Sequence, residues 1–200
     1  MNLPTYPARP VNGGPLSHAL HKHGHWSHSP KYNGWRTLVH IATGTMFNRQ
    51  GEQLSIAGEF RPALDQMRGA LDAEAFKWAD CEALERRHSL GRGTLILLDV
   101  IPEPAHRLAT CEERNLWVPP AVIPYHQIQT KPEPDMLYQP ERCSNGEVDV
   151  MWSQLKEANR RFGCEFYEGV VAKRADSLYP IQLRSPSQEF PFWMKHRWAF

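Results

Sequence analysis

The feature that most constrains this chain is the run Lys31-Tyr32-Asn33-Gly34-Trp35-Arg36. Asn-Gly is typical of a tight turn, and Gly34 permits the positive φ that lets backbone approach a ligand closely. Residues 36 to 42 are predicted to form a strand, so Arg36 returns toward the lysine with a guanidinium fork that suits a phosphate or carboxylate. The run therefore predicts a turn that presents an amine and a guanidinium to one site. An ordinary hairpin is the competing interpretation.

Five later segments continue the pattern along the chain. They are Asn48-Arg49-Gln50-Gly51, Asp80-Cys81-Glu82, Leu97-Leu98-Asp99, Glu168-Gly169-Val170-Val171-Ala172-Lys173 and Trp193-Met194-Lys195-His196-Arg197. With the first run, they resemble the ordered motifs of the covalent nucleotidyltransferases, which include ATP-dependent DNA ligases, RNA ligases and mRNA capping enzymes. The family reads K-x-D-G-x-R for the first run, then R-N-G, D-G-E and an aromatic followed by Asp, then E-G-V-V-x-K and W-x-K-x-K. The resemblance covers residues 31 to 197.

The resemblance implies a fold and an activity. The fold is the α+β nucleotidyltransferase fold, the ATP-grasp-like adenylation fold of ligases, in which two antiparallel sheets with flanking helices hold a nucleotide in the groove between them. The activity is that of an enzyme, an ATP-dependent DNA ligase that seals 3′-hydroxyl/5′-phosphate nicks in replication or repair. Nicked duplex DNA is the implied partner, because the first run, the Arg49 turn and Trp193-Met194-Lys195 look more like DNA ligases than RNA ligases. RNA is the alternative substrate.

The same resemblance assigns roles to single residues. Lys31 is the implied nucleophile, which attacks the nucleotide α-phosphate and carries AMP as a phosphoramidate. An amine attacks only when it is unprotonated, so desolvation or nearby cations must disfavour its ammonium form. Lys173 and Lys195 are the implied catalytic cations. The residues implied to bind the nucleotide are Arg36, Arg49, Glu82, Leu98, Val170, Lys173, Lys195 and Arg197.

Charge that develops on phosphoryl oxygens calls for a divalent ion beside ATP, here Mg²⁺ with Mn²⁺ as an alternative. Glu168 and Glu82 are the implied metal ligands, since Mg²⁺ prefers oxygen ligands and keeps several waters. Glu82 also suits a ribose hydroxyl. Val170 and Val171 alternate along a predicted strand, so one of them is expected to pack against the purine while the other enters the core.

Three residues depart from the family patterns. Asn33 replaces an Asp, Leu98 replaces the aromatic that usually stacks on the base, and Arg197 replaces a lysine. We also expect no C-terminal OB-fold after residue 200, so that a partner protein would supply its function. These departures leave two alternatives open, an RNA ligase or capping-type guanylyltransferase and a nucleotide- or nucleic-acid-binding subunit without independent ligation.

Three pairs of residues and one single residue also have purely structural interpretations. Asp80 and Glu82 suit the outward face of an edge strand. Lys195 and Arg197 suit a basic surface stripe, and Glu168 with Lys173 suits the charged ends of a solvated strand. An acidic residue such as Asp99 often caps a turn after an apolar strand.

Composition limits the class of protein. The 200 residues suffice for one substantial core, and no apolar run approaches the ~20 residues of a membrane span. The four cysteines contain no C-x-x-C pair, which favours a reduced, cytoplasmic chain without a disulfide framework. The net charge of +1 gives no general attraction for nucleic acid, so any contact with DNA must come from a local basic face.

Hydrophobic periodicity and turn residues predict the elements. Residues 1–30 are rich in Pro, Gly and His, show no helical or strand periodicity, and are expected to be an extended leader before a catalytic domain over residues 31–200. The leader holds His18, His21, His23, His25 and His28, and a solvated loop is favoured there over a metal site. Strands are predicted over 36–42, 45–49, 80–84, 94–101, 166–173 and 192–197. Helices are predicted over 62–78, 110–117 and 149–162, and a wrapped loop over 119–140.

Overall fold

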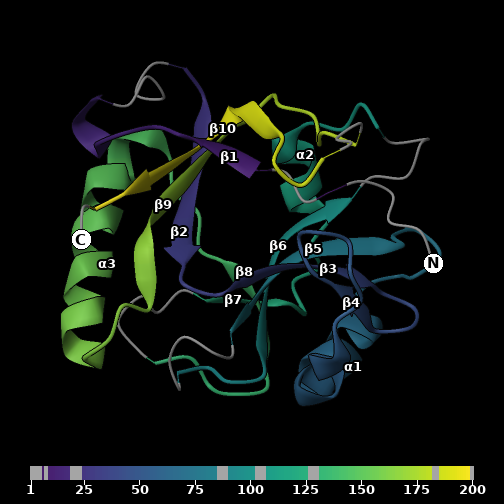
Figure 1. The fold of residues 1–200 in the computed structure, drawn as a ribbon. Helices are drawn as coiled ribbons and strands as arrows, with labels where there is room; N and C mark the ends of the chain where they lie inside the picture. The colour runs from purple at the N-terminus through teal and green to yellow at the C-terminus, as the bar shows by residue number, and fades with distance from the viewer. Residues whose placement is uncertain are drawn as a thin grey trace.

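Two β-sheets form the frame of the molecule in the computed structural model (Figure 1), which describes residues 6, 9–18, 24–84, 90–101, 107–125, 131–181 and 185–198. The four-stranded sheet has the order β1 (Arg9–Asn12), β10 (Glu189–Arg197), β9 (Tyr167–Arg174) and β2 (Trp26–Tyr32). The six-stranded sheet has the order β4 (Thr45–Phe47), β3 (Trp35–His40), β5 (Trp78–Leu84), β6 (Thr94–Ile101), β8 (Leu137–Pro140) and β7 (Ile123–Tyr125). Most neighbours are antiparallel, but β1–β10, β6–β8 and β7–β8 are parallel pairs.

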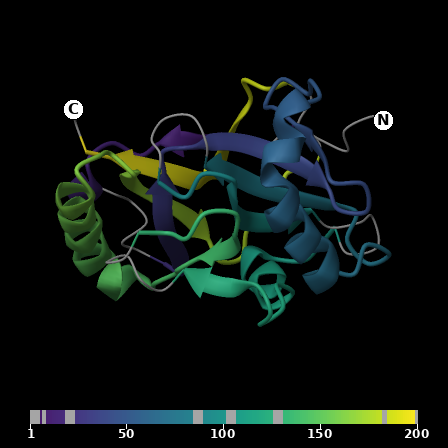
Figure 2. The ribbon, with the colours of Figure 1, turned by 90° about the horizontal axis from the view of Figure 1, so that it is seen from below.

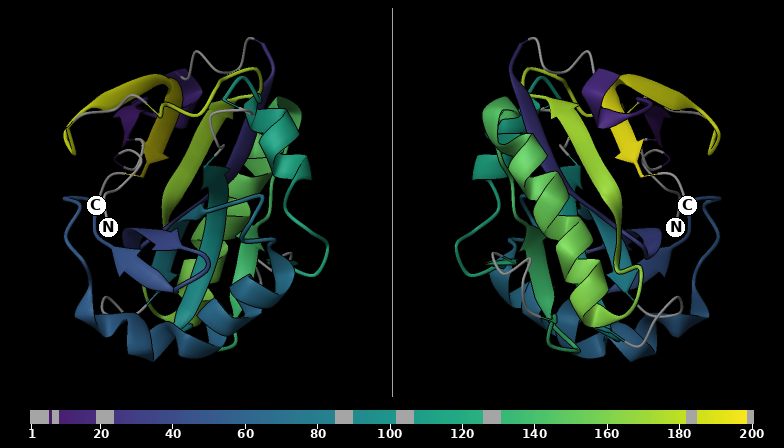
Figure 3. Two further views of the ribbon diagram at one scale, coloured as in Figure 1. Left: turned by 90° about the vertical axis from the view of Figure 1, so that its right-hand side faces the viewer. Right: turned by 90° about the vertical axis from the view of Figure 1, so that its left-hand side faces the viewer.

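Three α-helices flank these sheets in the part of the chain that the structure describes. The longest, α3 (Val148–Phe162), lies along the four-stranded sheet, whereas α1 (Arg61–Ala70) packs against β6 and β8 on the far side of the molecule (Figures 2 and 3). The short α2 (Cys111–Leu116) lies beside β6. The 3₁₀ turns are η1 (Leu16–His18), η3 (Ser55–Phe60) and η5 (Asn145–Glu147). None of the helices within the described ranges is long and apolar enough to cross a membrane.

The helix α3 forms where the apolar spacing predicts it. Its buried side chains are Val148, Met151, Leu155 and Ala158, which recur at intervals of three and four residues and so share one face. Gly163 ends the helix in the left-handed conformation, with φ of 70°. The capping box of α2 is also present, because the Thr110 hydroxyl accepts from the Glu113 amide and the Glu113 carboxylate accepts from the Thr110 amide.

Three hydrophobic cores hold these layers together. One core packs α1 and η3 against the six-stranded sheet and includes Val39, Met46, Phe60, Met67 and Leu97. A second packs α3 against the four-stranded sheet and reaches the other sheet through Leu84 and Ile96. A third joins Leu38 and Trp78 of the six-stranded sheet to Trp193 of β10. Because the last two cores contain side chains from both sheets, they fix the spacing of the groove between them.

The expected leader, in which no strand was predicted, contains strands at two places. β1 pairs with β10, and β2 begins at Trp26 and continues across the expected boundary at residue 30. Both are edge strands of their sheet, where a proline such as Pro10 or Pro30 removes no hydrogen bond that a central strand would need. Proline content therefore concealed two strands that carry part of the site.

Two other predicted elements differ in extent. The loop predicted over residues 119–140 contains β7 and β8, which extend the six-stranded sheet beyond β6. The helix predicted over residues 62–78 ends at Ala70, and Leu71 is already extended. Asp72 accepts a hydrogen bond from the Glu74 amide at 2.9 Å, a local turn that competes with helix.

Candidate nucleotide-binding site

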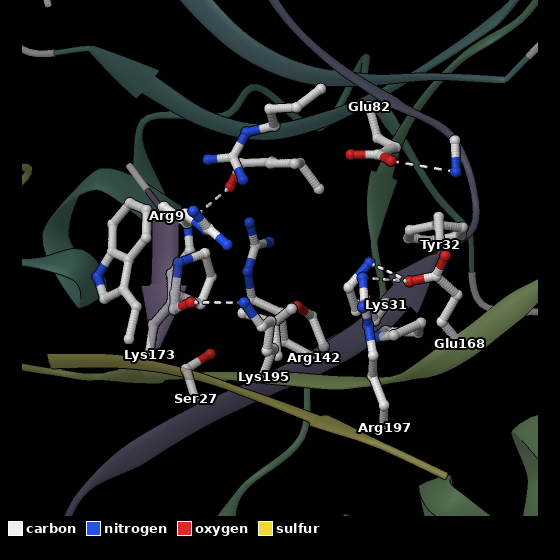
Figure 4. Close-up of a pocket in the computed structure, with 18 of the residues that line it drawn as sticks. Arg9, Ser27, Lys31, Tyr32, Glu82, Arg142, Glu168, Lys173, Lys195 and Arg197 are labelled. Carbon is white, nitrogen blue, oxygen red and sulfur yellow. Dashed lines mark hydrogen bonds and ion pairs between the residues drawn. The ribbon is translucent and has the colours of Figure 1, made fainter. Parts of the chain in front are cut away.

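A cavity of about 250 Å³ lies between the two sheets, and Figure 4 shows the side chains that point into it. One wall is a single face of the four-stranded sheet, where alternate residues of β2, β9 and β10 project. These residues are Ser27, Ser29, Lys31, Glu168, Val171, Lys173, Trp193, Lys195 and Arg197. The opposite wall contributes Arg36, Arg49, Glu82 and Leu98, and Arg9 of β1 and Arg142 of the loop after β8 also line the cavity.

The turn of the first motif connects the two sheets. β2 pairs with β9 and β3 pairs with β4 and β5, so the hairpin interpretation of Lys31 to Arg36 is wrong. Gly34 does not have the expected positive φ. It is required for a different reason, because a Cβ there would lie 2.6 Å from the Ala83 carbonyl oxygen of β5. The Gly34 amide donates to Glu82 Oε1 at 3.1 Å, which ties the turn to the six-stranded sheet.

A β-bulge aims Glu168 at the cavity. Lys31 is paired with Gly169 but Tyr32 is paired with Tyr167, so Glu168 is an extra residue on β9. The bulge puts Tyr167 on the core side and Glu168 on the cavity side, which simple alternation would reverse. Gly169 makes this possible, with φ of 144° and no room for a side chain, since a Cβ would meet the His196 carbonyl oxygen at 1.9 Å.

Glu168 receives two cations at one oxygen. Lys31 Nζ donates to Glu168 Oε2 at 2.5 Å, and Arg197 Nη2 forms an ion pair with the same oxygen at 2.8 Å. The Glu168 side chain is only 7% exposed, so the two cations stabilise a carboxylate that is largely removed from water. The solvated strand-end interpretation of Glu168 is therefore wrong.

A second bulge lies in β6, where Leu98 is the extra residue opposite β5. Leu98 lines the cavity, and Asp99 is buried behind it and accepts from Lys173 Nζ at 2.8 Å and Arg114 Nε at 2.8 Å. Burial alone would raise the pKa of Asp99, but the charges of Lys173 and Arg114 outweigh it and hold that pKa well below its usual range. Asp99 is therefore a buried anchor for Lys173, and the interpretation as a turn cap is wrong.

Arg36 is held by a similar buried anchor. Its guanidinium donates to both carboxylate oxygens of Asp80, and Tyr179 Oη donates to Asp80 Oδ2 at 2.8 Å. Burial alone would lower the pKa of Arg36, but the Asp80 charge more than offsets it and raises that pKa. β5 lies between β3 and β6, so the edge-strand interpretation of Asp80 and Glu82 is wrong.

Burial also shifts the pKa values of Glu82 and Lys195, two other groups that line the cavity. Burial raises the pKa of Glu82, although Lys31 and Arg36 act in the opposite direction. Burial and the neighbouring Arg9 lower the pKa of Lys195, whose Nζ donates to the Pro10 carbonyl oxygen at 3.1 Å. Lys195 and Arg197 both line the cavity, so they are not merely a surface stripe.

The structure brings most of the predicted site residues together. Lys31, Arg36, Arg49, Glu82, Leu98, Glu168, Lys173, Lys195 and Arg197 all line the cavity. Val170 does not, since it is fully buried in the core beneath α3, and its neighbour Val171 lines the cavity instead. Sequence reasoning missed Arg9, Ser27, Ser29 and Arg142. The alternation of Ser27, Ser29 and Lys31 along β2 was the available signal for two of them.

The histidine tract gives no metal centre in the part of the chain that the structure describes. No group of three or more His, Cys, Asp or Glu side chains there could hold a metal ion. His28 is fully buried in β2, and burial lowers its pKa to about 4, so the expected solvated loop is wrong at this residue. His21 and His23 lie outside the described residues.

The lining is strongly cationic in a chain of almost zero net charge. Counted over the described residues, eight lysine and arginine side chains and two glutamates face the cavity. Among the described residues, Arg49 and Arg142 have neither an ion pair nor a side-chain hydrogen bond, so their charges are available to a ligand. A polyphosphate is the ligand class that such a lining favours, because phosphate oxygens accept charge-assisted hydrogen bonds from each cation.

No protein-family model matches the sequence, and no curated protein matches it. Solved structures do match. The ligase domain of M. tuberculosis LigD is 20% identical with a TM-score of 0.56, over 96% of this chain and 59% of that one. Chlorella virus DNA ligase-adenylate is 12% identical with a TM-score of 0.55, over 95% of this chain and 69% of that one. An archaeal ATP-dependent RNA ligase is 15% identical with a TM-score of 0.54, over 96% of this chain and 48% of that one.

The match with these structures is one of fold. It extends over almost all of this chain, and it confirms the α+β architecture of two sheets with few helices. The chain spans only part of the length of the structures it resembles, from 46% of one with a TM-score of 0.61 to 69% of the Chlorella virus ligase.

Proposed function

We propose that this chain, which has the nucleotidyltransferase fold of ATP-dependent ligases, is itself an ATP-dependent polynucleotide ligase that works through AMP on Lys31. One observation carries the proposal. The Lys31 amine lies in a cavity lined by eight basic side chains, in contact with the buried carboxylate of Glu168. A cationic cavity attracts a nucleoside triphosphate, and the amine is the nucleophile within it.

In the first step, Lys31 Nζ attacks the α-phosphorus of ATP. A nitrogen–phosphorus bond forms, the bond from that phosphorus to the bridging oxygen breaks, and pyrophosphate leaves. Lys31 must first lose a proton, and Glu168 Oε2 at 2.5 Å is the nearest acceptor among the described side chains. Lys195 and Arg197 donate to the phosphoryl oxygens, where negative charge increases in the transition state.

In the next two steps, AMP moves from Lys31 to nucleic acid and then leaves. A 5′-phosphate oxygen attacks the phosphorus on Lys31, so an anhydride forms and the amine is released. A neighbouring 3′-hydroxyl then attacks the 5′-phosphate, a phosphodiester forms, and AMP departs. Lys173 is held in place by Asp99 throughout, so it can donate to phosphate oxygens without reorganising.

The carboxylates of the cavity fit a divalent ion. Mg²⁺ typically binds through one or two carboxylates with waters and substrate phosphates, and Glu168 and Glu82 supply two carboxylates on the cavity wall. Mn²⁺ has the same ligand preference. When bound, the ion would neutralise charge on the phosphoryl oxygens.

We propose DNA as the substrate. The motif resemblance supports it, and so does the likeness in fold to a viral DNA ligase. An RNA ligase has the same fold, so the choice is tested directly with nicked duplexes that differ only in the sugar beside the nick. Sealing of the DNA nick above the RNA nick is expected, and the reverse order would reassign the substrate.

The experiment that tests the activity is covalent labelling. The protein is incubated with Mg²⁺ and ATP or GTP labelled at the α-phosphate, denatured, and examined for bound label. Label from ATP that is absent in Lys31→Ala supports the proposal. Label from GTP indicates a capping-type guanylyltransferase, and no label from either with folded protein indicates a nucleotide-binding subunit.

A further inference from the structure

A second hollow adjoins the cavity at the end of β10. It has a volume of about 990 Å³, and Lys195 and Arg197 line both the cavity and this hollow. The other side chains that matter come from α3, namely Trp152 and Lys156, and from Trp198, which follows β10. We call this region the tryptophan hollow. Lys195 and Arg197 of β10 are therefore shared by the cavity and the hollow. The phosphates of a nucleic-acid backbone that runs from one to the other would stay next to positively charged side chains.

The two indole rings give the hollow flat apolar surfaces. The ring centroids of Trp152 and Trp198 are 5.0 Å apart with an interplanar angle of 75°, so the pair packs edge to face and each ring keeps a partly exposed side. Lys156 Nζ lies 6.0 Å from both centroids. An aromatic face next to ammonium and guanidinium groups is the combination that binds a nucleotide, because the base stacks while the phosphate pairs with the cations.

The charges of the hollow favour an anionic chain. Among the described residues, Lys156, Lys195 and Arg197 line it against one carboxylate, that of Asp149. Lys156 and Trp198 also line a further hollow along α3, together with Arg160 and Glu165. In a chain with a net charge of +1, such a local basic face is where electrostatic attraction for nucleic acid must come from.

We propose that the tryptophan hollow binds the nucleic-acid strand next to the reacting end, with a base on Trp198 and backbone phosphates at Lys156 and Arg197. The inference rests on the proposed ligase function, which supplies the nucleic acid at Lys31. It assigns to α3 a substrate-binding role in addition to covering the four-stranded sheet. The ordinary alternative is that the two tryptophans only pack the end of α3 against β10.

Fluorescence anisotropy of labelled oligonucleotides tests the proposal, with a 5′-phosphorylated single strand and a nicked duplex as probes. Lys156→Glu is compared with Arg61→Glu, which makes the same charge change on the exposed face of α1. We expect K156E to weaken binding by about tenfold at low salt and to reduce the salt dependence, and R61E to change affinity by less than about twofold. We expect W198A to weaken binding by about tenfold and W198F to restore most of it.

Labelling by ATP is measured on the same variants, which also shows that they are folded. K156E and W198A are expected to label like wild type, because neither residue lines the cavity. Wild-type affinity in both variants, or an equal loss in R61E, would overturn the proposal. If the wild-type protein takes no label but binds oligonucleotides through Lys156 and Trp198, the binding site in the hollow is supported and the proposed ligase function is contradicted.

Discussion

Lys31 and Glu168 are 137 residues apart in the sequence, yet Lys31 Nζ donates to Glu168 Oε2 at 2.5 Å. The contact depends on the pairing of β2 with β9 and on the bulge that turns Glu168 toward the cavity. Among the described residues, Glu168 is the only carboxylate in contact with Lys31. It therefore lies where the Lys31 amine must give up a proton before it can attack.

The first prediction concerns the nucleophile. Lys31→Arg keeps the positive charge but is expected to abolish covalent attachment of AMP, because guanidinium is essentially never deprotonated in proteins. The measurement is retention of label on denatured protein. Lys77→Arg is the control and should label normally. Labelling of K31R at the wild-type rate would remove Lys31 from its proposed role.

The second prediction concerns Glu168. Glu168→Ala is expected to slow label formation by about 100-fold or more while changing ATP affinity much less, since the carboxylate acts on the transition state. Rates of labelling and equilibrium binding of ATP are measured separately. Glu165→Ala, which removes an exposed carboxylate nearby, should leave both unchanged. Equal losses of rate and affinity in E168A would indicate a structural role instead.

The third prediction concerns the buried pair behind Lys173. Arg114→Met removes one partner of Asp99, and loss of one member of a buried ion pair typically costs about 3–5 kcal/mol. We expect the free energy of unfolding to fall by that amount in urea titrations. Arg92→Met, which removes an exposed arginine paired with Glu59, should cost less than about 1 kcal/mol. A cost in R114M as small as that of R92M would contradict the structural role of the pair.

The fourth prediction follows from the pKa of Asp99, which Lys173 and Arg114 hold below the ordinary value of 3.8 despite burial. A depressed folded pKa contributes stability above the unfolded pKa, and this contribution is lost as pH falls through the folded pKa. We therefore expect the stability advantage of wild type over Asp99→Asn to shrink as pH falls below about 4. Urea unfolding over a pH series measures it. A constant difference across that range would refute the assignment.

The fifth prediction concerns the glycine of the bulge. Gly169→Ala is expected to destabilise the protein by at least about 2 kcal/mol, because its backbone conformation is strained for alanine and a Cβ would collide with β10. Gly58→Ala is the matched control, since a Cβ there meets nothing within 4 Å. Urea unfolding compares the two, and similar stabilities of G169A and G58A would show that β10 moves aside at little cost.

Local patterns in the sequence were enough to predict the elements whose residues follow a simple periodicity or a capping motif. The helix α3 follows from apolar residues three and four apart, α2 from its capping box, and β6 from a run of apolar residues. The grouping of Lys31, Glu168 and Lys195 in one cavity could also be predicted, because they occur in motifs whose order resembles a known family. These inferences need no knowledge of which strands pair.

Tertiary structure decided which side chains face the cavity. The bulges at Glu168 and Leu98 reverse the alternation of a strand, and they exist only because a partner strand has one residue fewer at that point. The same cause puts Val171 in the cavity and Val170 in the core. Arg9 lines the site because β1 pairs with β10, although the two strands lie near opposite ends of the sequence. No local sequence pattern predicts a pairing between residues so far apart in the chain.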